Sequence, residues 1–310
     1  MKRGEVVVVL LIMALLIFPV ISAINFSDFW KDFRARITGQ LTSGSSSLNI
    51  TVGNAAPTIP VVYVAASYSA TEGTFTRTVV NFTARDSDGE ANLNDSTAQG
   101  RFQFSGEPTR SNTSCLTLGA GSGTDQNYTC TIDMWYFDKP ASWTANFTIK
   151  DNNNAGGENS TTTFTFSSLN AMVLSPPSLT WPQVSLTSTD TSSDNDPITI
   201  NNTGNVEGIR VNITALDLRG ETTTTQFIFA NNFTVDVNST NGCSGKIMTN
   251  GTSTNVTTTI TFRGNNSLNF KNLTSGQQNT TYCLKGVLST ISAQSYSTSF
   301  YGPWTVAVVT

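Results

Sequence analysis

The 310-residue chain carries a formal net charge of −4, contains no histidine and has only 12% charged residues, about half of what is usual for a soluble protein. Without histidine the chain cannot build a Ser-His-Asp or Cys-His catalytic arrangement or a histidine-ligated zinc site, so we do not expect an enzyme. Its acidic and basic residues are interspersed and leave no basic face, so we do not expect it to bind nucleic acid. Its 49 Thr, 34 Ser and 30 Asn favour strands joined by polar turns, and 18 Phe, 5 Trp and 7 Tyr are too many for the alternative, a disordered Ser/Thr-rich stalk.

Residues 1–23 have the features of a secretory signal peptide. A positively charged start precedes an apolar run from Val6 to Ile21, and Ala23 offers a cleavage site. Two alternatives remain. The run could stay uncleaved as an N-terminal anchor, although it is short for a membrane span, or Arg3-Gly4-Glu5 could mark a pilin-type signal, since it resembles the processing site of archaeal type IV pilin-like proteins. All three place the rest of the chain outside the cell.

Residues 24–41 are predicted to form a short amphipathic helix. Five apolar residues recur at helical spacing along one stripe: Phe26, Phe29, Trp30, Phe33 and Ile37. Two interpretations stay open, because the helix could fold back on the following β-domain, or rest on a membrane surface or a neighbouring subunit. Residues 42–53 read as a flexible linker that ends in an alternating, strand-like segment, Leu48 to Val52.

Residues 54–169 are predicted to form an immunoglobulin-like (Ig-like) β-sandwich. Apolar and polar residues alternate within Val79 to Ala84, Tyr128 to Phe137 and Trp143 to Ile149, as in strands that are buried on one face. About seven such strands separated by turns suit an antiparallel sandwich.

The densest acidic cluster follows the first of these strands and contains Asp86, Asp88, Glu90 and Asp95. Oxygen ligands at alternating positions suit calcium, but the glycine is not placed as in an EF-hand loop. The simpler interpretation is an Asx turn, in which the aspartate side chains accept hydrogen bonds from nearby backbone N–H groups. We expect no cofactor, with calcium at this loop as the alternative.

Residues 170–310 are predicted to form a second Ig-like sandwich in tandem with the first. The boundary is marked by Ser175-Pro176-Pro177, and a strand with one wet face is clear where Ile209, Val211 and Ile213 alternate with polar residues.

Four cysteines in an exported chain predict two disulfides. Cys115 and Cys130 flank a Gly-rich hairpin loop, so we expect them to pair locally, which leaves Cys243 with Cys283 in the second domain. The other two connectivities would cross-link the domains.

The chain holds 17 Asn-x-Ser/Thr sequons, against about 8 expected by chance, which indicates N-glycosylation. The alternative is that Thr-rich strands and Asn-rich turns simply adjoin often. The acceptors that we predict are Asn49, Asn81, Asn112, Asn127, Asn146, Asn212, Asn232, Asn250, Asn272 and Asn279.

Two segments resemble known surface proteins. In the first domain, Asn81 to Gly89 (N-F-T-A-R-D-S-D-G) followed by Asn92-Leu93 resembles the F-T-A-x-D-x-D-G-x-x-D-L signature of Ig-like and cadherin-like repeats on microbial, especially archaeal, cell surfaces, with Asn92 where an acidic residue is usual. In the second, Ile200 to Asn205 and Val211 to Thr214 resemble a segment of archaeal surface and TasA-like fibre-forming β-sandwiches.

The resemblance implies an extracellular scaffold in which an extended strand of one subunit completes the sandwich of the next. Asn49 to Val52 or Trp304 to Val308 could play that part, unless both belong to their own domains. We therefore expect a secreted structural glycoprotein of the cell surface, an envelope-layer or filament subunit that associates with itself or with other surface proteins. The alternative is an adhesion module that binds a glycan or a protein through sandwich loops, near Trp135, Tyr136 and Trp181.

Overall fold

The computed structural model describes Ser27, Lys31 and residues 49–237, 242–256, 260 and 276–309. The chain divides into two compact units, residues 1–53 and 54–310. Ser27 and Lys31 are helical and exposed. The whole predicted signal segment, residues 1–23, and the rest of the predicted helix over 24–41, including all five residues of its apolar stripe, lie outside the described residues.

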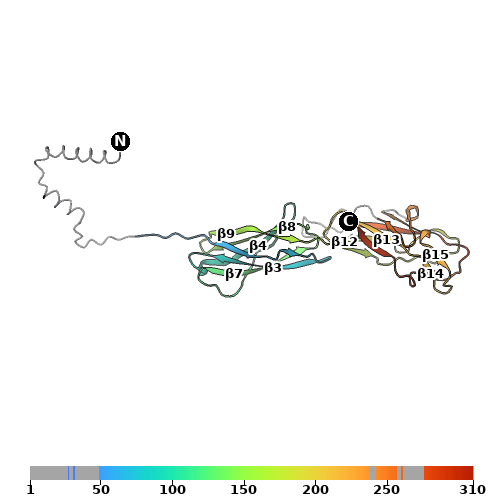
Figure 1. Ribbon diagram of the computed structural model, residues 1–310, viewed down its shortest axis with the longest axis horizontal. Coiled ribbons are helices and arrows are strands. Elements are labelled where there is room, and N and C mark those ends of the chain that lie inside the picture. Colours follow the sequence, from blue (N-terminus) through green and yellow to red (C-terminus); the bar gives the residue numbers. More distant parts are fainter. Residues whose placement is uncertain are drawn as a thin grey trace, which may run out of the picture. The chain divides into compact units, whose positions relative to one another are not determined.

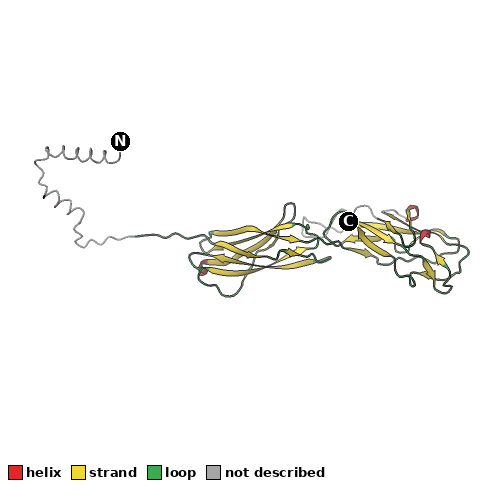
Figure 2. Cartoon of the chain, in the orientation of Figure 1, coloured by secondary structure: helices red, strands yellow, loops and turns green. Residues whose placement is uncertain are grey.

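The all-β prediction is confirmed for the second unit, in which the described residues form strands and three short 3-10 turns (Figure 2). The turns are η2 (Glu90–Asn92), η3 (Ala230–Asn232) and η4 (Gly242–Ser244). No helix among the described residues is long and apolar enough to cross a membrane. Below, residues 54–169 are called the first half and residues 170–309 the second half.

Two sheets build the first half. The four-stranded sheet has the order β1-β3-β7-β6, from β1 (Thr58–Tyr63), β3 (Phe75–Arg85), β7 (Asp125–Trp135) and β6 (Leu116–Thr117). The five-stranded sheet has the order β2-β9-β8-β4-β5, from β2 (Ser67–Tyr68), β9 (Gly156–Phe166), β8 (Ser142–Asp151), β4 (Leu93–Gln103) and β5 (Arg110–Asn112). All pairs are antiparallel except β2 with β9.

These sheets form two layers that share one hydrophobic core (Figure 1). Successive strand residues point to opposite faces, so the alternation read in the sequence buries Phe82 from β3 and Trp143 and Phe147 from β8. The rings of Phe82 and Phe147 lie 5.1 Å apart between the two sheets. Gly100 of β4 allows this close packing, because a Cβ there would come within 2.6 Å of the Phe147 ring.

Three sheets build the second half. The six-stranded sheet contains β10 (Met172–Ser175), β12 (Ile198–Asn202), β19 (Gln277–Gly286), β16 (Phe233–Val237) and β17 (Lys246–Ile247) in that order, and β11 (Thr189–Ser192) also pairs with β19. One three-stranded sheet has the order β18 (Ser253–Asn255), β13 (Arg210–Thr214), β21 (Thr305–Val309), and the other β15 (Phe227–Ile228), β14 (Leu218–Gly220), β20 (Tyr296–Ser297).

A second hydrophobic cluster, formed by buried residues between Ile198 and Ile291, lies in these sheets and is separate from the first cluster, which spans Ile59 to Phe166. The predicted domain boundary at residue 169 falls between the two clusters. The assignment of both halves to Ig-like sandwiches stays a prediction.

Candidate functional site

The predicted calcium loop is an Asx turn. Asp86 is fully buried, and its carboxylate accepts hydrogen bonds from the backbone N–H of Asp88 at 2.8 Å and from the side-chain amide of Asn92 at 3.1 Å. Glu90 lies against Gly121, and Asp95 accepts a 2.5 Å hydrogen bond from a tyrosine hydroxyl. Among the described residues these four carboxylates do not form a group with metal-ligand spacing, and calcium binding stays a prediction.

A polar network that the sequence analysis missed ties the start of the second unit to this turn. Asn54 donates to the buried carboxylate of Asp151 at 2.7 Å, and the N–H of Ala55 donates to Asp88 at 2.8 Å. The Asn54 side chain, followed by backbone N–H groups of the β8–β9 turn, holds the pKa of Asp151 below its ordinary value. These hydrogen bonds therefore hold the chain in place from residue 54 onward. In the sequence, the run Asp151-Asn152-Asn153 was the feature that could have indicated this polar network.

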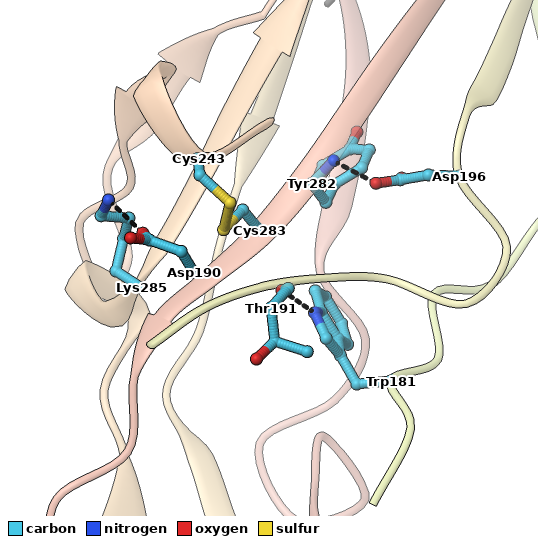
Figure 3. Close-up of a disulfide and its surroundings, with 8 residues drawn as sticks. All are labelled: Trp181, Asp190, Thr191, Asp196, Cys243, Tyr282, Cys283 and Lys285. Carbon is cyan, nitrogen blue, oxygen red and sulfur yellow. Dashed lines mark hydrogen bonds and ion pairs between the residues drawn. A yellow bond between two sulfur atoms is a disulfide. The ribbon is translucent and has the colours of Figure 1, made fainter. Parts of the chain in front are cut away.

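Both disulfides join the pairs that the sequence favours. Cys115–Cys130 connects the start of β6 to β7, and Cys243–Cys283 connects η4 to β19 (Figure 3). Two disulfides indicate a compartment outside the reducing cytosol. Secretion itself stays a prediction.

The surroundings of Cys243–Cys283 are polar on one side. Asp190 lies beside the sulfur atoms and pairs with Lys285 of β19 (Figure 3). Within the described part of the chain, Asp190 and these two cysteines form the one group with metal-ligand spacing. Because both thiols are oxidised to the disulfide, they cannot act as thiolate ligands, and the site is structural.

The sequon asparagines differ in exposure. Asn49, Asn127, Asn250 and Asn279 are exposed, and Asn81, Asn112, Asn212 and Asn232 are half-buried. Asn272 lies outside the described residues. Asn146 does not fit the prediction, because it is only 7% exposed and its amide donates to Glu158 at 2.6 Å. A glycan needs water around it, and the central position of β8 between β9 and β4 denies it that space.

The second half contains an apolar groove with a volume of about 1290 Å³. Its lining includes Ile198, Ile213, Phe233 and Leu284 from four different strands and the polar segment 292–298. None of the described residues that line it is charged. Since a charge pays a large desolvation penalty in such surroundings, the apolar groove suits an uncharged occupant.

Two tryptophans fix one wall of the apolar groove. The rings of Trp181 and Trp304 meet Phe233 edge-on at 5.2 and 5.3 Å. The indole N–H of Trp181 donates to the Thr191 carbonyl at 3.1 Å (Figure 3), and that of Trp304 donates to the Leu216 carbonyl at 2.8 Å. With their polar atoms satisfied, both indoles are held in place, so the protein itself fixes this wall.

The two segments considered for strand exchange behave differently. Trp304–Val308 overlaps β21, which pairs with β13 along its whole length and turns Val306 and Val308 toward the second core. This segment therefore belongs to its own domain. Residues 49–52 lie in no strand, and Ile50 and Val52 are 72% and 85% exposed.

The aromatic residues nominated for adhesion are not an exposed surface. Tyr136 is 2% exposed, and Trp135 and Trp181 are half-buried. Among the described residues of the second half, the exposed aromatic side chains are instead Phe229, Phe300 and Tyr301. Sequence reasoning missed them because exposure in loops has no periodicity.

Comparison with known proteins gives no match to any protein-family model and none to a curated protein.

Proposed function

We propose that this chain is an extracellular structural glycoprotein, a subunit of a cell-envelope layer or filament, and not an enzyme. The proposal is supported by the apolar N-terminal segment, the excess of sequons, the lack of histidine and the two disulfides. The apolar segment, the sequons and the disulfides favour a durable protein outside the cell, and the lack of histidine disfavours the common hydrolase mechanisms.

One observation carries the self-association part of the proposal. Leu48 to Val52 alternates apolar and polar residues as a half-buried strand does, yet Ile50 and Val52 are 72% and 85% exposed and lie in no strand. The hydrogen bonds that hold Asn54 and Ala55 in place begin directly after this segment. A strand pattern without a sheet of its own is the expected form of a segment that pairs with a second copy.

The apolar groove and β21 provide the acceptor. β21 is the last described strand of its sheet, so one of its edges has no strand partner among the described residues, and Trp304 and Val306 at its start line the apolar groove. An added strand would continue the sheet with main-chain hydrogen bonds and place alternate side chains in the groove. Both the segment and the groove lining are uncharged.

The strength of one such contact is modest. Full burial of Ile50 and Val52 contributes about 3–6 kcal/mol, while association costs at least about 4 kcal/mol in lost translation and rotation. Main-chain hydrogen bonds add about 1 kcal/mol each. We therefore expect assembly at micromolar or higher concentrations, driven by many repeated contacts.

The test uses the full-length chain produced in a host without N-glycosylation. Ile50→Asp/Val52→Asp places two charges on the apolar face, and the control Asn49→Asp/Thr51→Asp places the same two charges on the polar face. Sedimentation velocity over a concentration series and negative-stain microscopy should show assembly of the wild type and the control but not of the first variant. A wild type that stays monomeric at the highest concentration, or equal behaviour of the two variants, would contradict the proposal.

A further inference from the structure

An exposed aromatic cluster lies where β14, β15 and the segment after β20 meet, and it consists of Phe227, Phe229, Phe300 and Tyr301. Phe229, Phe300 and Tyr301 are 44%, 62% and 49% exposed. The Phe227 ring lies 6.3 Å from both Phe229 and Tyr301, and Phe300 meets Tyr301 edge-on at 4.9 Å. Exposed aromatic side chains that gather in this way mark interaction surfaces in soluble proteins.

Polar groups with fixed positions border the aromatic cluster. The Arg219 guanidinium lies 3.7 Å from the centre of the Phe300 ring and donates to the Thr224 carbonyl at 2.8 Å. The Glu221 carboxylate accepts hydrogen bonds from the hydroxyls of Ser297 and Ser299. These hydrogen bonds, with Arg219 nearby, lower the pKa of Glu221, so the carboxylate is ionised at neutral pH. The rings are thus flanked by one ordered cation and one ordered anion.

The two segments that supply the aromatic cluster contain no sequon. Residues 213–230 and 280–310 supply the aromatic cluster and contain no asparagine, although at the average frequency of 30 Asn in 310 residues these 49 residues would hold about five. N-linked glycans are bulky and solubilising, so a scarcity of sequons favours close contact with the rings. The predicted acceptor Asn232 lies three residues after Phe229, outside these two segments.

We propose that the aromatic cluster, with Arg219 and Glu221, binds a neutral carbohydrate. The face of an aromatic ring carries a negative electrostatic potential, which attracts the polarised C–H bonds on the flat face of a pyranose. The carboxylate and guanidinium at the edge can then exchange hydrogen bonds with the hydroxyl groups of the sugar.

Two other occupants fit less well. A stable protein interface takes about 800 Å² and roughly 20–30 residues per partner, whereas three exposed aromatic side chains among polar neighbours offer only a small apolar patch. A membrane surface would favour several basic residues beside the rings. Residues 213–230 and 280–310 contain only Arg219 and Lys285 as basic residues, and Lys285 pairs with Asp190.

The test measures binding of the full-length chain to neutral hexasaccharides of glucose, mannose, galactose and N-acetylglucosamine, first on an array and then by calorimetry. We expect at least one to bind, and Phe300→Ala/Tyr301→Ala to weaken its binding by at least about tenfold. Glu221→Gln, which keeps the side-chain shape, should weaken binding as well. The control is Tyr63→Ala, since Tyr63 is also 62% exposed but lies in β1 of the first half.

Near-ultraviolet circular dichroism confirms that each variant is folded. The proposal is overturned if no hexasaccharide binds, or if Tyr63→Ala lowers binding as much as the cluster variants do. It is also overturned if Phe300→Ala/Tyr301→Ala abolishes self-association or flotation with phosphatidylcholine/phosphatidylglycerol vesicles and leaves sugar binding intact. Self-association through Ile50 and Val52 is a separate matter that either result leaves open.

Discussion

Removal of each disulfide should destabilise only the half of the molecule that contains it. A disulfide stabilises mainly by restricting the unfolded chain, and its effect grows slowly with the length of the closed loop. Cys115 and Cys130 are 15 residues apart and Cys243 and Cys283 are 40 apart. In the chain-entropy relation, these lengths correspond to about 3 and about 4 kcal/mol of unfolding free energy. The two hydrophobic cores are separate clusters, so each loss of unfolding free energy should be confined to the half that contains the disulfide.

The assay is urea unfolding of Cys115→Ala/Cys130→Ala and Cys243→Ala/Cys283→Ala, followed by circular dichroism. Alanine avoids free thiols that could form new disulfides. We expect each variant to shift one transition to lower urea and leave the other in place, with the larger shift for the second variant. A loss below about 1 kcal/mol in both variants, or equal shifts of both transitions in either one, would refute the reasoning about loop closure or about separate cores.

The second disulfide also bears on the apolar groove. Tyr282 and Leu284 of β19 line the groove, and Cys283 lies between them on the opposite face of the strand. The disulfide therefore lies behind the groove wall and is not part of it. At urea concentrations where the second half is still folded, Cys243→Ala/Cys283→Ala should self-associate as the wild type does.

Three further predictions concern the first half. Phe82→Ala should lower the free energy of unfolding by about 3–5 kcal/mol, because the buried Phe82 ring contacts both sheets. The control is Val79→Ala, since Val79 is 57% exposed on the other face of β3. In the same urea assay this control should lower the free energy of unfolding by under about 0.5 kcal/mol. The Arg85 guanidinium, which donates to Asp125, lowers the pKa of Asp125 from 3.8 to about 2. The ion pair therefore stabilises the folded state above about pH 4, and this stabilisation is lost as the pH falls toward 2. Asp125→Asn should remove this contribution to the acid sensitivity of unfolding, measured in unfolding curves from pH 4 to 2. In the native host, Asn127→Gln should remove one glycan mass, while Asn146→Gln should remove none, as read by intact-protein mass spectrometry; a glycan on Asn146 would contradict its burial.

The strand pattern could be read from the sequence wherever one face of a strand is fully buried. The alternation in Val79 to Ala84 and Trp143 to Ile149 places Phe82 and Trp143 in the core, because a period of two is a local property of extended chain. Where distant residues compete for a segment, the pattern fails. Between β15 and β16, for example, η3 interrupts the extended chain, and the N–H of Ala230 there donates to Asp217 at 2.8 Å.

The candidate sites show the same division. The local Asx turn at Asp86 could be anticipated, since Asp88 is two residues away. Its attachment to Asn54 through Asn92 and Asp151 could not, because these residues come from three separate segments of the chain. The exposed cluster around Phe300 depends in the same way on loops that meet only in the folded protein.

By itself the sequence determined the all-β class, the alternation of core residues and the disulfide pairs, since each follows from spacing along the chain or from composition. Tertiary structure alone decided that Asn146 is buried, that β21 pairs with β13, and that an uncharged groove and an exposed aromatic cluster lie in the second half. The physical reason is that burial and exposure are set by neighbours from remote segments, whose positions no local pattern specifies.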